Sequence, residues 1–305
     1  MKKLIYYISI VLTLAACQNN EDIWMKDTPS GKESLVTITM SPIKAAYSDI
    51  ITRGVEDYTG ETIQELLYSL QYIVTDADSN FVARGTLTTE DIADFQSLNL
   101  SLDMGHYTLY MLGEGLNTSL MHTTEELREP GTVSDMWYHN IRFQPVRREV
   151  FYAQQEFTVD GSGMEIALNV ELRRQVGMLD INVECSDETF KFIGLNLLIP
   201  DAYAANYMTV DGQFGFDMND TDGTGFYWKK NIGYGNAPIP VEGETYRARF
   251  FMFPTLADYM GENVPSIIFT YLLGTNENNL YNKEISLKDL KIEANRVTTI
   301  NITVE

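Results

Sequence analysis

Alternation of apolar and polar residues dominates the chain from residue 35 onward. The longest example is residues 164–172, where every second residue from Met164 to Leu172 is apolar. This period places apolar side chains on one face of a β-strand, as in a half-buried sheet. The same pattern predicts strands at residues 36–40, 68–75, 81–84, 95–102, 106–112, 149–159, 179–185, 192–199, 247–253, 266–273, 281–287 and 296–304.

Helical signals are scarce: only residues 123–128, with a Thr-led start and an acidic first turn, predict a short helix. The spacing of strands and turns is typical of antiparallel β-sandwiches. A length of 305 residues exceeds what one core usually holds, which favours two domains. The strands flanking residues 173–175 are too long and too closely joined to form one hairpin. We therefore expect an N-terminal β-sandwich domain at 35–173 and a C-terminal one at 174–305.

The first 16 residues form a leader with Lys2 and Lys3 followed by a mostly apolar run. The run is shorter than the roughly 20 residues of a membrane-spanning helix and has the flanks of a secretory signal peptide. Leu14-Ala15-Ala16-Cys17 resembles a bacterial lipobox, in which the cysteine is acylated and becomes the first mature residue. The alternative is an ordinary signal peptide with an incidental cysteine. We expect lipidation at Cys17 and a protein that is anchored to a membrane without spanning it.

Residues 17–34 carry charges, Gly, Pro and Ser without apolar periodicity, and we interpret them as a flexible tether. The whole chain has 43 acidic and 22 basic residues and a net charge of −21. Such acidity disfavours nucleic acid as a partner and anionic lipid as a means of attachment. Besides Cys17, the only cysteine is Cys185, which shares an apolar strand face and is interpreted as a small core residue.

Signals of catalysis are absent from the sequence. The three histidines lack partners at metal-ligand spacing, and no nucleophile elbow or dinucleotide loop occurs. The loop at 217–223 resembles a calcium loop, but Thr221 occupies the third ligand position, which favours a solvated loop. We expect no enzymatic activity, no metal and no cofactor.

Four segments carry a resemblance to a known family: residues 66–76, 172–177, 251–255 and 290–300. In order and spacing they resemble the type V fimbrial lipoproteins of Bacteroidetes. The resemblance implies two tandem transthyretin-like Greek-key sandwiches in a non-catalytic subunit of a fimbrium. It implies a place at the cell outer membrane or in the pilus, as stalk, tip or anchor, and a role in cell adhesion. Other fimbrial subunits and ligands on host or bacterial surfaces are the implied partners.

The first strand is the candidate for subunit joining. Val36, Ile38 and Met40 have the alternation needed to fill the groove of a sandwich, as in donor-strand complementation. By resemblance, an arginine-specific protease would cut between Arg53 and Gly54, remove this strand and open the groove. The alternative is that Arg53 is an ordinary loop residue and the strand stays, as in an anchor.

A second class of function stays open. Tyr227, Trp228 and Tyr234 lie among glycines, where aromatic rings can stack on sugars or pack in a core or interface. A surface glycan-binding lipoprotein of a polysaccharide-uptake system would share the lipid anchor, the acidity and the β-sandwiches.

Overall fold

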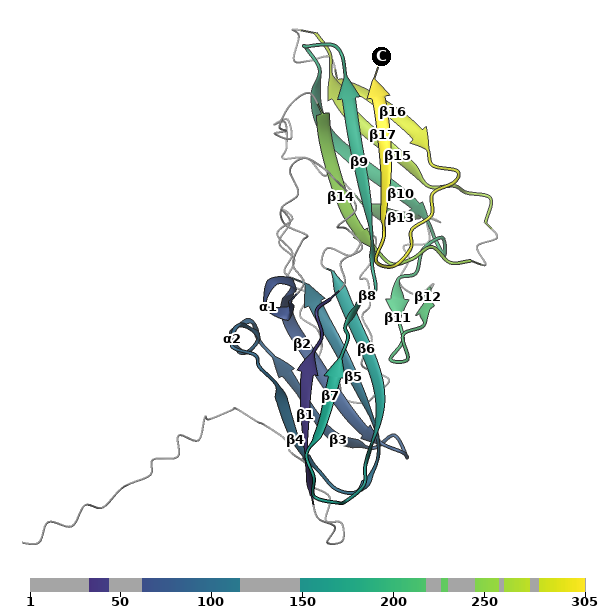
Figure 1. The fold of residues 1–305 in the computed structure, drawn as a ribbon. Coiled ribbons are helices and arrows are strands. Elements are labelled where there is room, and N and C mark those ends of the chain that lie inside the picture. The colour runs from purple at the N-terminus through teal and green to yellow at the C-terminus, as the bar shows by residue number, and fades with distance from the viewer. Residues whose placement is uncertain are drawn as a thin grey trace, which may run out of the picture.

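The computed structural model describes residues 33–43, 62–115, 149–217, 226–229, 245–257, 261–274 and 280–304, which are almost entirely β-structure (Figure 1). Two short helices occur in this described part, α1 (Ile63–Leu66) and α2 (Thr89–Ala93). The prediction of a mostly β chain is confirmed. The helix predicted at 123–128 lies outside the described residues.

The amino-terminal half contains two sheets. The first has the order β4-β1-β7, with bounds β1 (Ser34–Met40), β4 (Leu98–Leu102) and β7 (Ile166–Val170). The second has the order β3-β2-β5-β6-β8, with bounds β2 (Leu67–Asp76), β3 (Phe81–Leu87), β5 (Gly105–Gly115), β6 (Val150–Val159) and β8 (Arg173–Arg174). Apolar side chains from both sheets share one buried cluster, so the two sheets pack face to face around a common core.

The carboxyl-terminal half also contains two main sheets around one core. The first has the order β14-β9-β17, with bounds β9 (Gly177–Cys185), β14 (Thr245–Met252) and β17 (Val297–Val304). The second has the order β13-β10-β15-β16, with bounds β10 (Lys191–Pro200), β13 (Phe226–Lys229), β15 (Ser266–Leu272) and β16 (Leu280–Ser286). A small hairpin, β11 (Tyr207–Met208) and β12 (Phe214–Gly215), stands apart from both.

The same strand path occurs in both halves. In each, the first strand is central in a three-stranded sheet, where it pairs parallel with the last strand and antiparallel with another. We leave out the two-residue β8 and the β11–β12 hairpin and number the strands of each half from one to seven. Both halves then have a three-stranded sheet of order 4-1-7 and a four-stranded sheet of order 3-2-5-6. The two halves are therefore topological repeats.

The predicted strands correspond closely to those observed, and local chemistry sets their ends. The β2–β3 turn is fixed by Asp76, whose Oδ1 accepts hydrogen bonds from the backbone N–H groups of Asp78 at 3.0 Å and Asn80 at 2.8 Å. The two short helices were not expected, although each begins with a capping box, Thr62 with Glu65 and Thr88 with Asp91. Apolar alternation alone does not reveal elements of four or five residues.

A buried ion pair lies where the chain passes from one half to the other. The fully buried Arg174 places its Nε 2.5 Å from Glu149 Oε1, and its guanidinium stacks over the Phe151 ring. Another of its N–H groups donates to Asn295 Oδ1 at 3.0 Å, and the Asn295 backbone N–H donates to the Val176 carbonyl at 2.8 Å. Burial raises the pKa of Glu149, and the neighbouring guanidinium opposes that shift. Arg174 of the first half thus holds a turn of the second.

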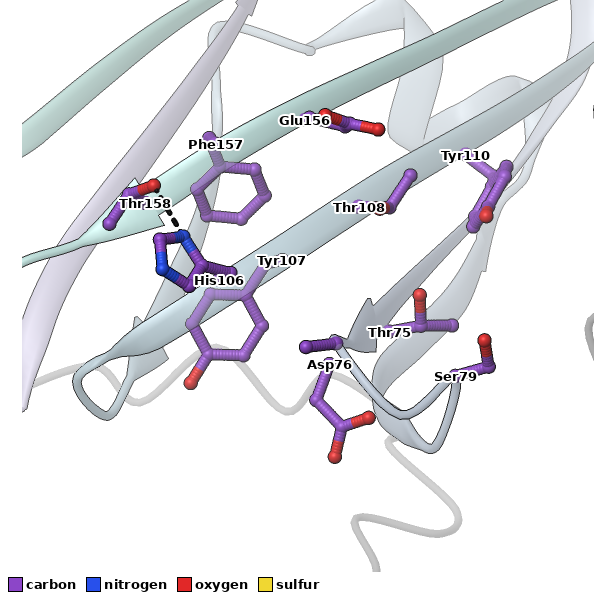
Figure 2. A pocket seen from close by; sticks show the side chains of 11 residues that line it. Thr75, Asp76, Ser79, His106, Tyr107, Thr108, Tyr110, Glu156, Phe157 and Thr158 are labelled. Carbon is purple, nitrogen blue, oxygen red and sulfur yellow. Dashed lines mark hydrogen bonds between the residues drawn. The ribbon is translucent and has the colours of Figure 1, made fainter.

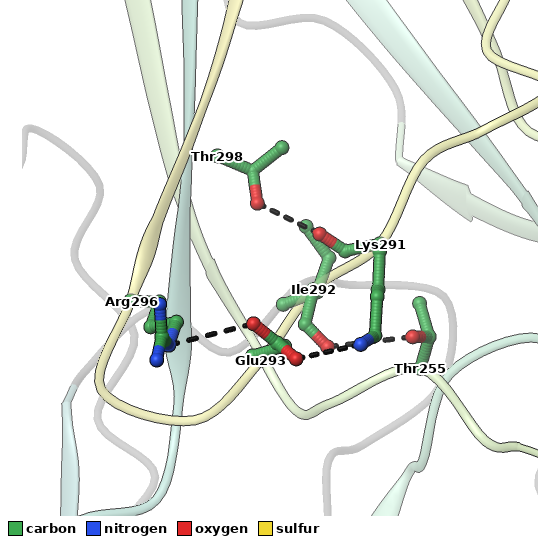
Figure 3. A network of polar contacts seen from close by, with 6 residues as sticks. All are labelled: Thr255, Lys291, Ile292, Glu293, Arg296 and Thr298. Carbon is green, nitrogen blue, oxygen red and sulfur yellow. Dashed lines mark hydrogen bonds and ion pairs between the residues drawn. The ribbon is translucent and has the colours of Figure 1, made fainter.

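The turn that carries Asn295 is itself braced by polar contacts (Figure 3). The Ile292 carbonyl accepts from the backbone N–H of Thr255 at 3.0 Å and from its hydroxyl at 3.3 Å. Glu293 forms ion pairs with Lys291 at 2.6 Å and with Arg296 at 3.4 Å. These exposed pairs add little stability, so the backbone contacts are what position the turn.

Three of the segments that carry the family resemblance therefore meet in space, namely 172–177, 251–255 and 290–300. Gly177 belongs to the first, and a Cβ at this position would overlap the carbonyl oxygen of Glu293 in the third. The close approach of the two backbones explains why glycine stands there.

A third apolar cluster joins the halves. Ile73, Leu112 and Tyr152 of the first half pack with Met208 and Phe253 of the second. The Tyr152 hydroxyl donates to a carbonyl in the β11–β12 hairpin. The outer face of the five-stranded sheet is thus partly covered by the second half.

Asn295 provides a test of the contact between the two halves. It has a φ of 56° and accepts the bond from Arg174. Asn295→Ala should lower the free energy of unfolding by about 2–4 kcal/mol, because it removes a charged hydrogen bond and replaces asparagine, which tolerates the left-handed region, by alanine, which does so less readily.

Asn295→Gly is the matched control, since it removes the same bond while tolerating the positive φ. It should cost about 1 kcal/mol less than the alanine variant. Urea unfolding followed by circular dichroism measures both. Equal and negligible effects would show that this contact does not stabilise the joint.

Candidate functional site

The first strand, β1, is bonded along both of its edges. On one side it runs antiparallel to β4, with Val36 opposite Leu100 and Ile38 opposite Leu98. On the other side it runs parallel to β7, with Ile38 opposite Leu168. Removing β1 would leave two strands separated by the width of the missing one, each with an unpaired row of backbone groups facing the gap.

The alternation predicted for this strand is present. Val36 and Ile38 are 0% exposed and belong to the first core, and Met40 is half-buried against it. Thr37 and Thr39 point outward, and the Thr37 hydroxyl donates to Glu165 Oε1 at 2.6 Å. The inner face of β1 is therefore an apolar row that fills the space between its neighbours.

Most of the remaining predicted site residues are not among those that the structure describes. Cys17, Arg53, Gly54 and Tyr234 lie outside the described residues. Tyr227 and Trp228 lie in β13, at register positions opposite Ile199 and Leu198 of β10. Their side-chain positions also lie outside the described part, so the glycan interpretation stays a prediction.

Cys185 is half-buried and packs against the second core, in keeping with its interpretation as a small apolar residue. Within the described ranges, no group of three or more His, Cys, Asp or Glu side chains could hold a metal ion. The same ranges contain no helix long and apolar enough to cross a membrane.

A polar cavity of about 420 Å³ lies at the end of β2, β5 and β6 (Figure 2). His106 Nδ1 and Thr158 Oγ1 are 2.9 Å apart there, and Glu156 lines the same cavity. The ring of Tyr107 turns toward the core, where it stacks on Phe157 at 5.5 Å. The Asp76 carboxylate already accepts bonds within its own turn. The cavity therefore presents hydroxyls, carboxylates and the imidazole of His106.

The sequence model of a prokaryotic membrane lipoprotein lipid attachment site matches residues 1–18, which include Cys17. The chain is thus a membrane-anchored lipoprotein, as its leader predicts. No curated protein sequence matches the chain.

Solved structures share its fold at low sequence identity. A candidate cell adhesion protein from Bacteroides fragilis is 13% identical, with 90% of this chain and 93% of that chain covered at a TM-score of 0.50. A candidate polysaccharide-binding protein from Bacteroides thetaiotaomicron is 9% identical, covering 89% and 91% at 0.49. The fimbrial anchor protein Mfa2 from Porphyromonas gingivalis is 12% identical, covering 84% and 83% at 0.40. The likeness to a candidate Bacteroides cell adhesion protein is thus confirmed at the level of fold.

The buried face of β1 can be tested by truncation. Ile38→Ala should lower the free energy of unfolding by about 2–5 kcal/mol, because it leaves a cavity in the first core. Leu35→Ala is the matched control on the same strand, since Leu35 is 47% exposed, and should cost less than about 1 kcal/mol. Urea unfolding measures the difference, and similar small values for both variants would contradict the placement of β1 in the core.

Proposed function

We propose that the protein is a non-catalytic fimbrial subunit or anchor that joins its neighbours by strand complementation. The observation that carries the proposal is the central position of β1, with both edges bonded and its apolar row buried. The fold shared with a candidate cell adhesion protein supports the same assignment.

In this proposal the chain forms two transthyretin-like domains, 35–173 and 174–305, with the boundary inside β8, so that Arg174 begins the second domain while its strand pairs with β6 of the first half. The repeated strand path supports the division, because each repeat has its own pair of sheets and its own core. The cluster around Arg174 and Tyr152 would then be the interface that fixes one domain on the other.

Cleavage after Arg53 would have two consequences at once. β1 lies between Cys17 and Arg53, so the strand that fills the groove also connects the body to its lipid. A cut chain would offer an open groove to a donor strand and leave its acyl chains behind. An uncut chain would keep the groove filled and stay on the membrane, as an anchor does. We place the uncut form at the outer membrane, in contact with other fimbrial subunits.

The first residue of the protein recovered from cells decides between these states. A lipidated Cys17 in the membrane fraction identifies the anchor, and Gly54 in sheared fibres identifies a processed subunit. Arg53→Gln should abolish the Gly54 form without changing the lipidated form, because an arginine-specific protease loses its recognition residue.

The proposal fails if the protein is absent from sheared fibres and from complexes with fibre subunits. Polysaccharide retardation in native gels that disappears in Trp228→Ala would then support glycan binding in its place.

A further inference from the structure

Two methionines stand out on the surface. Met104 is 67% exposed and Met164 is 66% exposed, the highest values among the large apolar side chains in the described residues. Single exposed apolar residues are common and need no explanation. These two, however, lie at the same end of the molecule.

The turns that carry them are in contact. Met104 lies between β4 and β5, and a Cβ at Gly161, between β6 and β7, would be 3.1 Å from the Met104 Cβ. Met164 follows that turn and precedes β7. Ser34, the first residue of β1, lies opposite Leu102, two residues before Met104. The methionines therefore lie at the end of the first half where β1 begins, away from the second half (Figure 1).

Leu35, the second residue of β1, is also exposed and lies opposite Ser101 of β4, three residues before Met104. Leu35, Met104 and Met164 together are called the apolar tip below. Unbranched methionine side chains adapt to irregular apolar surroundings, which suits contact with lipid chains that have no fixed shape.

The lipid attachment site brings this tip close to a membrane. Glu33, where the described part of the chain begins, follows Cys17 by only 16 positions. Even fully extended, this stretch spans at most about 55 Å. The tip is thus confined near the bilayer, and tethering raises the effective concentration of any weak contact.

The charges around the tip are acidic. Glu33, Asp103, Asp160 and Glu165 lie beside it, and hydrogen bonds from Ser162 lower the pKa of Asp160 so that it stays ionised. Anionic head groups would be repelled by these carboxylates, whereas zwitterionic head groups would not.

From these observations we propose that the apolar tip is a docking surface for the zwitterionic bilayer that holds the Cys17 lipid. Docking seats the first half on the membrane and directs the second half away from it. The proposal rests on the lipid attachment site and does not depend on fimbrial assembly.

Methionine oxidation tests the docked state. The lipidated chain on phosphatidylcholine vesicles is treated with hydrogen peroxide, and sulfoxide formation at Met104 and Met164 is followed by peptide mass spectrometry. The reference is the same chain without lipid, beginning at Gln18, in solution. Oxidation should slow about tenfold on the vesicles, which corresponds to about nine chains in ten being docked.

Leu280→Met supplies the control, because Leu280 is 55% exposed in the second half. The introduced methionine should oxidise at the same rate with and without vesicles. Protection of Met104 and Met164 should be lost on phosphatidylglycerol vesicles. Equal rates at all three positions on phosphatidylcholine would overturn the proposal. Protection that appears in solution as the protein concentration rises would also overturn it, since a second copy would then cover the tip.

Discussion

The first half depends on the backbone hydrogen bonds of β1. Its three-stranded sheet has no direct pairing between β4 and β7, so β1 is what makes those strands one sheet. The equivalent strand of the second half, β9, has the same central position. However, β9 follows β8 after only Gln175 and Val176, inside the joint between the halves. The same topology therefore places β1 near the start of the described residues and β9 in the middle of the chain, beside the contact between the halves.

The contact between the two halves depends on residues whose burial the sequence pattern does not predict. An arginine is normally expected at the surface, yet Arg174 is fully buried between Glu149 and Asn295. Two of these partners are more than a hundred residues apart, so only the folded chain shows why they occur together. Removing one charge of such a pair leaves the other buried and uncompensated, which is strongly destabilising. The segments near 174 and 295, which carry the family resemblance, are therefore linked by this contact.

The sequence predicts the strands well because alternation is a local property, but pairing is not. Nothing local indicates that β1 runs parallel to β7, since the partners Val36 and Ile166 are 130 positions apart in the sequence.

 The sequence also did not show that β2 is buried on both faces, because Ile73 is covered by side chains from the distant second half. The sequence predicted the candidate site only as an apolar strand. The hydrogen bonding of both edges of β1 could be recognised only from the folded structure.

The two ends of the molecule have different surroundings. β1 begins at the end away from the second half, and β17 runs toward the opposite end (Figure 1). A chain anchored near β1 therefore presents the sheets of the second half farthest from its lipid. There β17 pairs with β9 along one edge, and the described residues supply no strand for the other edge. An unpaired edge can accept an extended segment of another chain. Among the described residues, the free edge of β17 is thus open to an extended segment, whereas both edges of β1 in the first half are already paired.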